Sequence, residues 1–211
     1  MKNMKTSSEI FFDKLLKLEF PHQVLYGRGV VDINEHLNTL KEYSSKCNIV
    51  TEMGTRFGIS VLSLLMGKPK KVISIDCNPH FFEPYFGETK KFADECQTEF
   101  EFIVADVLDM EISQTDLLFI DTLHTYNQLS KELRIHERKV NKWIILHDTV
   151  TFGSVDEDFY QNGIINESIR NEKKTKTGLY TAMIDFLEEN KNWRIKEHFT
   201  NNNGLTILER V

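Results

Sequence analysis

Two short stretches of this 211-residue chain, FIDTLHTY and WIILHDT, combine two carboxylates with a histidine. Asp121 ends one predicted strand and His124 follows it by three residues, whereas Asp148 ends the next predicted strand. Neighbouring strands lie about 5 Å apart, so carboxylates at their ends repel each other unless a cation lies between them. Such oxygen ligands favour Mg²⁺, Ca²⁺ or Mn²⁺. We therefore expect a metal ion that holds an acceptor hydroxyl and lowers its pKa, with His124 as the general base.

A second unit, residues 48–78, predicts a strand, a glycine-containing turn, a helix and another strand. The turn contains Gly54 and Gly58, and the second strand ends on Asp76. A parallel sheet binds its ligand at the carboxyl ends of its strands, so the turn and this acid should face the same cleft.

The spacing of the glycines separates two classes of cofactor. The dinucleotide turn G-x-G-x-x-G needs its second glycine so that the backbone can approach a pyrophosphate. In this chain Arg56 occupies that position, which disfavours NAD and FAD. The remaining pattern suits a nucleoside with a short charged tail: the turn surrounds an amino acid moiety, and Asp76 accepts two hydrogen bonds from ribose hydroxyls.

Five successive predicted strands end on acids, which an open parallel sheet would bring to one edge. These acids are Glu52, Asp76, Asp106, Asp121 and Asp148. Near the C-terminus, Asn203-Gly204 is typical of a hairpin turn, so the last strand should run antiparallel to its neighbour. The chain is therefore predicted to have an α/β fold: a doubly wound, seven-stranded Rossmann-like sheet, mostly parallel with an antiparallel C-terminal hairpin, plus N-terminal helices.

The length fits a single domain with a full α/β core. Thr6 with Glu9, and Asp32 with Glu35, predict capping boxes for two N-terminal helices. We divide the chain 1–211 into an N-terminal helical segment (1–47), a cofactor-binding core (48–150), a lid or substrate loop (151–177) and a C-terminal helix and hairpin (178–211).

The composition of the chain indicates which kinds of partner and which cellular compartment to expect. A net charge of −6 argues against a primary role on nucleic acid, which needs a basic face. The three cysteines are odd in number and lack C-x-x-C spacing, which favours a reducing compartment. No apolar stretch is long enough for a signal sequence or a membrane span. We expect a cytoplasmic protein that does not bind membranes, whose two N-terminal helices could form the interface of a homo-oligomer.

The run EMGTRFGIS, together with Asp76, resembles motif I and the acidic loop of class I S-adenosylmethionine-dependent methyltransferases. It is most similar to the branch that contains the macrocin-type sugar O-methyltransferases and the cephalosporin hydroxylase-like proteins, methyltransferase family 24. The resemblance covers about residues 48–150, and GLYTAMIDFLEENKNW and NNNGLTILER extend it. It implies S-adenosyl-L-methionine as the cofactor, with Asp106 near the adenine amino group. The implied cofactor-binding residues are Glu52, Gly54, Thr55, Arg56, Gly58, Ser60, Asp76 and Asp106.

FIDTLHTY and WIILHDT are similar to the metal-dependent members of that branch. The resemblance implies that Asp121 and Asp148 bind the cation and that His124 is the base. Some relatives carry a carboxylate where this chain has His147, which leaves the third ligand open. His147 could bind the ion, orient Asp148 from behind, or pack as a strand-end histidine, and the last two roles together are favoured.

The predicted function is methyl transfer from S-adenosylmethionine to a hydroxyl of a small molecule or sugar, assisted by a divalent cation, with Mg²⁺ expected. Replacing Asp121 or His124 by alanine should abolish transfer and leave cofactor affinity nearly intact, and Gly54→Val should lose the cofactor. A vicinal diol would chelate the ion well.

Two further alternatives stay open besides an NAD-dependent enzyme. The chain could be an S-adenosylmethionine-binding module without catalysis. It could also be a non-haem iron oxygenase, because His124, Asp121 and His147 offer two imidazoles and a carboxylate. The oxygenase reading leaves Gly54 and Asp76 without a purpose.

Overall fold

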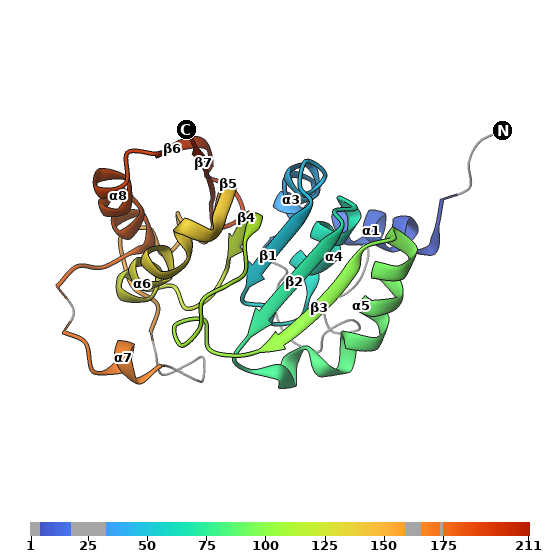
Figure 1. Cartoon of the computed structure of the whole chain (residues 1–211), viewed down its shortest axis with the longest axis horizontal. Helices are drawn as coiled ribbons and strands as arrows, with labels where there is room; N and C mark the ends of the chain where they lie inside the picture. The colour runs from blue at the N-terminus through green and yellow to red at the C-terminus, as the bar shows by residue number, and fades with distance from the viewer. Residues whose placement is uncertain (1–4, 18–32, 159–165, 174) are drawn as a thin grey trace.

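The computed structural model describes residues 5–17, 33–158, 166–173 and 175–211 (Figure 1). Its centre is a seven-stranded sheet in the order β3-β2-β1-β4-β5-β7-β6. Five strands are parallel, and β7 pairs antiparallel with both β5 and β6, so the predicted fold is confirmed. The strands are β1 (Ile49–Met53), β2 (Lys71–Asp76), β3 (Glu99–Val104), β4 (Thr115–Ile120), β5 (Val140–His147), β6 (Trp193–Phe199) and β7 (Leu205–Arg210).

Helices cover both faces of the sheet, because apolar side chains alternate along the central strands and must be buried on each side. In β4, Leu117 and Phe119 pack into one apolar cluster, and Leu118 and Ile120 pack into the other. The first cluster joins α1 (Ser7–Leu16), α3 (Leu37–Ser44), α4 (Ile59–Met66) and α5 (Glu83–Cys96), and the second joins α6 (Tyr126–His136) and α8 (Leu179–Glu189). The remaining elements are α7 (Glu167–Arg170) and the 3₁₀ turns η1 (Asn34–His36), η2 (Pro79–Phe81) and η3 (Glu137–Lys139).

The first predicted capping box is confirmed: Thr6 accepts a hydrogen bond from the backbone of Glu9, and the Glu9 carboxylate accepts one from the Thr6 backbone. Asp32 of the second box lies outside the described residues. Helix α3 follows η1 directly and has no side-chain cap at His36. None of the described helices has the length and apolar character needed to cross a membrane.

The strand order reverses between β1 and β4, the point at which open α/β sheets bind ligands. The backbone of Asp121, just after β4, donates to Met53 O at 2.9 Å, and Gly54 N donates to Ile75 O at 2.9 Å. Gly54 has φ +88°, and a Cβ there would lie 2.0 Å from the carbonyl oxygen of Asp121. The backbone of Gly54 in the glycine turn therefore packs against the backbone of Asp121, the first predicted metal ligand.

Two details differ from the sequence-based expectations. Glu52 lies within β1, because the strand continues to Met53. Residues 151–177 are not irregular throughout, since α7 lies within them. The role of this segment as a lid or substrate loop stays a prediction, as does the division of the chain into functional segments.

Candidate active site

The loop that joins β1 to α4 is predicted to bind the cofactor, and we call it, with the neighbouring Asp76 and Asp106, the cofactor half of the site. Asp76 holds this loop in place. Asp76 Oδ2 accepts hydrogen bonds from Thr55 N at 2.9 Å and Arg56 N at 2.8 Å, and its Oδ1 accepts one from Asn78 N at 2.8 Å. Arg56 has φ +45°, and Gly58, which begins α4, has φ +78°. A carboxylate has about four lone-pair positions, so Asp76 keeps acceptor capacity for a hydroxyl after three protein bonds.

Glu52 lies beneath this loop, with none of its surface exposed. Its carboxyl group accepts a hydrogen bond from the Ser74 hydroxyl, which lies 2.6 Å from Thr55 Oγ1. Burial raises the pKa of Glu52 to about 8, although the Ser60 and Ser74 hydroxyls lower it, so the group is neutral at pH 7. The structure thus places Glu52 and Ser60 under the turn as a support, and direct contact of either with the cofactor stays a prediction.

Asp106 lies two residues beyond β3, in the loop between β3 and β4, and its side chain accepts hydrogen bonds there. Its Oδ1 accepts from Leu108 N at 2.9 Å, and its Oδ2 accepts from Asn166 Nδ2 at 2.9 Å. Asn166 caps α7 and therefore ties residues 166–170 to the cofactor half. No sequence pattern predicts this contact, which joins positions 60 residues apart.

The predicted metal ligands and the predicted base lie at the ends of β4 and β5, and we call this group the metal half of the site. Asp121, His124 and Asp148 each direct a ligand atom to one place, and these three atoms lie within 4.8 Å of one another. His124 Nε2 lies 3.2 Å from Asp121 Oδ1 and 3.0 Å from Asp148 Oδ2. His147 Nδ1 lies 3.4 Å from each of the same two oxygens, although His147 is not one of those three residues. The structure therefore brings all four predicted side chains of this half together.

Residues 149–158 enclose the His124 ring. Glu157 Oε2 lies 3.0 Å from His124 Nδ1, and Glu157 N donates to His124 O at 2.8 Å. Phe152 stacks on the imidazole, with the ring centroids 4.9 Å apart and the planes at 10°. Neither Glu157 nor Phe152 was expected here, because nothing in their spacing links them to a histidine about thirty residues earlier.

Three solved structures have the same fold along most of their length. An O-methyltransferase from Bacillus cereus in complex with SAH has a TM-score of 0.61 at 13% identity, covering 100% of this chain and 94% of that one. TomG, an O-methyltransferase from Streptomyces achromogenes involved in tomaymycin synthesis and solved with SAM, has 0.58 at 10%, covering 99% and 91%. The N-terminal domain of EvdMO1, solved in the presence of SAH and D-fucose, has 0.52 at 13%, covering 100% of both chains.

The chain has the class I methyltransferase fold. No protein-family model and no curated protein matches its sequence. Fold alone does not fix an activity, so the chemistry has to be argued from the site.

In this methyltransferase fold, the loop suits a cationic nucleoside better than a pyrophosphate. A dinucleotide would place its phosphates against the backbone N–H groups of the turn. Here those of Thr55 and Arg56 already donate to the Asp76 carboxylate, which would repel an anion. S-adenosylmethionine carries a sulfonium and ribose hydroxyls, and both are compatible with a carboxylate. The residues present therefore fit this cofactor.

In the metal half, the carboxylates and the imidazoles shift each other's pKa values. Burial lowers the pKa of His147, but the Asp121 and Asp148 carboxylates outweigh it and raise the value to about 10. Burial likewise lowers the pKa of His124, and the three carboxylates of Asp121, Asp148 and Glu157 raise it well above its usual range. Burial raises the pKa of both aspartates, whereas the two histidines lower it below the ordinary value. Without a cation, protons on the imidazoles balance the two aspartates.

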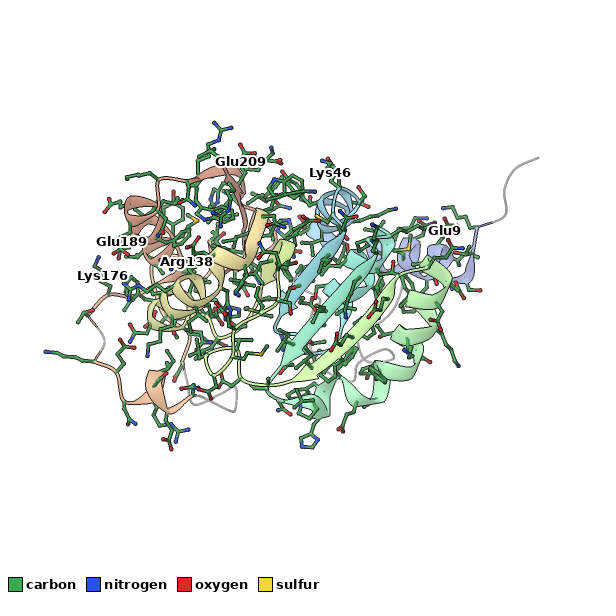
Figure 2. The ribbon with its side chains drawn as sticks, in the orientation of Figure 1. Glu9, Lys46, Arg138, Lys176, Glu189 and Glu209 are labelled. Atoms are coloured by element: carbon green, nitrogen blue, oxygen red, sulfur yellow. The ribbon has the colours of Figure 1, made fainter. Side chains whose placement is uncertain are left out.

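These groups differ from the charges on the outer surface. Figure 2 shows Lys46 and Lys176 projecting from the periphery of the fold, where Lys46 pairs with Glu42, four residues earlier. Exposed pairs of this kind contribute little to stability. In the metal half, the Asp148 side chain is 5% exposed and that of His147 is 1% exposed. His147 Nδ1 and Asp148 Oδ1 are buried and have no hydrogen-bond partner among the described residues, so the donor set fits a cation.

Proposed function

We propose that this chain is an S-adenosylmethionine-dependent O-methyltransferase that methylates a hydroxyl of a small molecule, a sugar in particular, with the help of a divalent cation. The observation that carries the proposal is the contact between the two halves of the site. The carbonyl of Asp121 packs against Gly54, at the point where the strand order reverses. A methyl donor in the loop and an oxygen held at Asp121 would therefore be neighbours.

In this proposal Asp121 and Asp148 hold the cation, which when bound would polarise an acceptor hydroxyl and make its proton easier to remove. His124 accepts that proton. Phe152 keeps the ring plane fixed by stacking, and Glu157 restrains Nδ1, so that Nε2 stays directed at the Asp121 and Asp148 carboxylates, which would hold the cation and its hydroxyl. The sulfonium methyl is already electrophilic, so most of the acceleration comes from holding the oxygen in line behind it.

The chemistry of the site favours a polyol as the acceptor. A vicinal diol offers two oxygens to one cation, and two carboxylates leave open positions for both. The presence of D-fucose in the EvdMO1 crystals supports a sugar as the first class to test. Mg²⁺ as the ion, a cytoplasmic location and a homo-oligomer stay predictions from the sequence.

The test combines binding and turnover. Calorimetry with S-adenosylhomocysteine should show binding, whereas NAD should not bind. A panel of sugars and polyols incubated with S-adenosylmethionine carrying a labelled methyl group should give a labelled ether, and EDTA should suppress it. Binding without transfer to any acceptor would indicate a non-catalytic module. Turnover that requires iron and 2-oxoglutarate, with no labelled product, would indicate an oxygenase.

A further inference from the structure

We infer that His147 is a nitrogen ligand of the cation and that the site therefore selects a first-row transition-metal ion over Mg²⁺. The inference rests on the proposed function only in placing a cation between Asp121 and Asp148. It goes beyond that proposal in naming a third ligand and a class of ion that replaces the Mg²⁺ expected from the sequence, and it does not require methyl transfer.

The first step concerns the proton on the His147 ring. His147 Nε2 lies 3.2 Å from the carbonyl oxygen of Asn202, in hydrogen-bonding geometry. A carbonyl oxygen only accepts, so Nε2 carries a hydrogen and donates it. Metal-binding histidines are commonly held in this way by a backbone carbonyl on the far side of the ring. In the neutral ring, Nδ1 is then left with its lone pair.

The turn that supplies this carbonyl is rigid. Asn202 and Asn203 have φ of +44° and +68°, and the Asn203 carbonyl accepts from Val150 N and Thr151 N. His36, a buried neighbour whose ring packs edge-on against His147 at 5.9 Å, binds the adjacent carbonyl of Asn201 at 3.0 Å. The orientation of the His147 ring is therefore fixed from behind.

The second step concerns what Nδ1 faces. It points at Asp121 Oδ1 and Asp148 Oδ2, at 3.4 Å from each, and neither contact has hydrogen-bonding geometry. A charged hydrogen bond between imidazole and carboxylate is shorter, about 2.7–2.9 Å. Ligand atoms that share an ion with bonds of roughly 2.1 Å lie roughly 3.0–3.4 Å apart. A lone pair and two carboxylate oxygens at this spacing are what a cation requires.

The two histidines differ in this respect. His124 Nε2 lies 3.2 Å and 3.0 Å from the same two oxygens, but it forms a hydrogen bond with Asp121 Oδ1, and its Nδ1 faces the Glu157 carboxylate. Acceptors on both sides of the ring stabilise the protonated form that a base reaches when it has taken up a proton. His147 donates through Nε2 to the Asn202 carbonyl, and its Nδ1 faces the two predicted carboxylate ligands without a hydrogen bond to either. We therefore keep His124 as the base and assign His147 to the ion.

A nitrogen ligand changes which ion binds. Mg²⁺ takes oxygen ligands almost exclusively, whereas imidazole suits Zn²⁺, Co²⁺, Ni²⁺ and Fe²⁺, and Mn²⁺ accepts mixed sets. Two carboxylates and one imidazole should therefore bind Mn²⁺, Co²⁺ or Zn²⁺ more tightly than Mg²⁺, even though an all-oxygen site would suit Mg²⁺.

The experiment uses the full chain stripped of metal by a chelator. Mn²⁺ binding is followed by electron paramagnetic resonance, Mg²⁺ binding by competition, and Co²⁺ binding by its visible absorption. We expect the wild type to prefer Mn²⁺ and Co²⁺ to Mg²⁺ by about tenfold or more. His147→Asp places an oxygen as many bonds from Cβ as Nδ1 is, so it should shift the preference toward Mg²⁺ by about tenfold. His147→Phe should weaken Mn²⁺ binding by about 10- to 100-fold.

His198→Gln is the matched control, since His198 lies in β6, on the hairpin that supplies the Asn202 carbonyl, and contacts Thr206 instead of the carboxylates. It should leave metal selectivity unchanged. Tight Mg²⁺ binding by the wild type, unchanged Mn²⁺ affinity in folded His147→Phe, or no metal binding at all would overturn the inference. Should the variants not fold, NMR of the Co²⁺-loaded wild type decides: a hyperfine-shifted, exchangeable imidazole N–H supports a histidine ligand, and its absence refutes one. Metal binding with this selectivity but without methyl transfer would refute only the proposed function.

Discussion

The cofactor half and the metal half share one edge of the sheet, yet their acids are stabilised in different ways. Asp76 accepts three backbone hydrogen bonds, and Asp106 accepts one from Leu108 N and one from the Asn166 amide. Asp121 and Asp148 instead face two histidines, and Asp148 Oδ1 has no hydrogen-bond partner in the part of the chain that the structure describes. The acids of the first half find their partners within the protein, whereas those of the second are held by opposed charges and would be completed by the proposed cation.

This difference predicts which ligand each half takes. The backbone N–H groups of the loop already donate to Asp76, and the spare acceptor capacity of this carboxylate suits a neutral ribose and a cationic sulfonium. Buried carboxylates that lack full partners cost free energy, which binding of a cation recovers. The sharpest tests therefore perturb one half and measure the other.

The largest effect is expected for Asp121→Ala. Loss of one carboxylate removes the cation and the acceptor oxygen with it, so methyl transfer should fall by roughly a thousandfold, about 4 kcal/mol in the barrier. Affinity for S-adenosylhomocysteine should change less than about threefold, because the cofactor half keeps its own hydrogen bonds. Turnover and calorimetry on the same preparation measure both. A parallel loss of cofactor affinity would show that the halves are not separable.

Gly54→Ala should instead impair both halves of the site together. The sequence alone led us to expect that a larger residue here would lose only the cofactor. In the structure a Cβ at Gly54 would lie 2.0 Å from the Asp121 carbonyl, and the residue has φ +88°, so either the loop or Asp121 must move. We expect a loss of roughly 2–4 kcal/mol in the free energy of unfolding and weaker binding of both cofactor and metal.

Gly87→Ala serves as the control for this substitution. Gly87 lies in α5, and a Cβ there meets nothing within 4 Å. This change should stabilise the protein by about 0.5–1 kcal/mol, since alanine favours a helix. Denaturation curves with and without ligand compare the two variants. Normal metal binding in Gly54→Ala would contradict the backbone coupling that the structure shows.

The two halves should also respond differently to pH. Burial raises the pKa of Glu52 to about 8 from an ordinary 4.5, so the folded protein keeps a proton that the unfolded chain releases. The free energy of unfolding should therefore fall as the pH rises from 4.5 to 8, by up to about 1.4 kcal/mol per pH unit from this group. Glu52→Gln should flatten that slope, measured as the difference between wild-type and variant denaturation curves. Identical slopes would mean that Glu52 is ionised when buried.

In the metal half, His147 gives a slope of the same sign as Glu52 but at higher pH, whereas the aspartates give the opposite sign in acid. The pKa of His147 is raised to about 10 from 6.5, so its stabilisation is fully present below pH 6.5 and is lost as the pH rises to 10. The aspartates have lowered pKa values, so their contribution is present at neutral pH and is lost in acid. A bound cation replaces the imidazole protons, so metal-loaded protein should lose the alkaline part of this dependence.

The sequence was sufficient to predict the sheet and the meeting of Asp121 with Asp148. The central strands are apolar on both faces, and acids at the ends of neighbouring parallel strands must be close. The Asn203-Gly204 turn predicted the final antiparallel pairing for a similar local reason, because its backbone conformation requires such residues.

Other features depend on contacts that no local pattern encodes. The burial of Glu52 follows from the exact end of β1 at Met53, one residue beyond the expected tip. The approach of Gly54 to Asp121 depends on the register between β1 and β4. The contacts of Asn166 with Asp106 and of Glu157 with His124 join segments far apart in the chain, and only tertiary packing brings them together.

Glu157→Gln is the mildest test of the comparison, because it alters neither a predicted metal ligand nor the cofactor loop. Glutamine keeps the size of the side chain but removes the charge 3.0 Å from His124 Nδ1, so the ring is held less firmly. We expect kcat to fall by about tenfold, with KM and cofactor affinity nearly constant. Glu172→Gln, which disturbs only an exposed pair with Lys131, should leave kcat unchanged. If Glu157→Gln changed KM alone, Glu157 would act on the acceptor and not through His124.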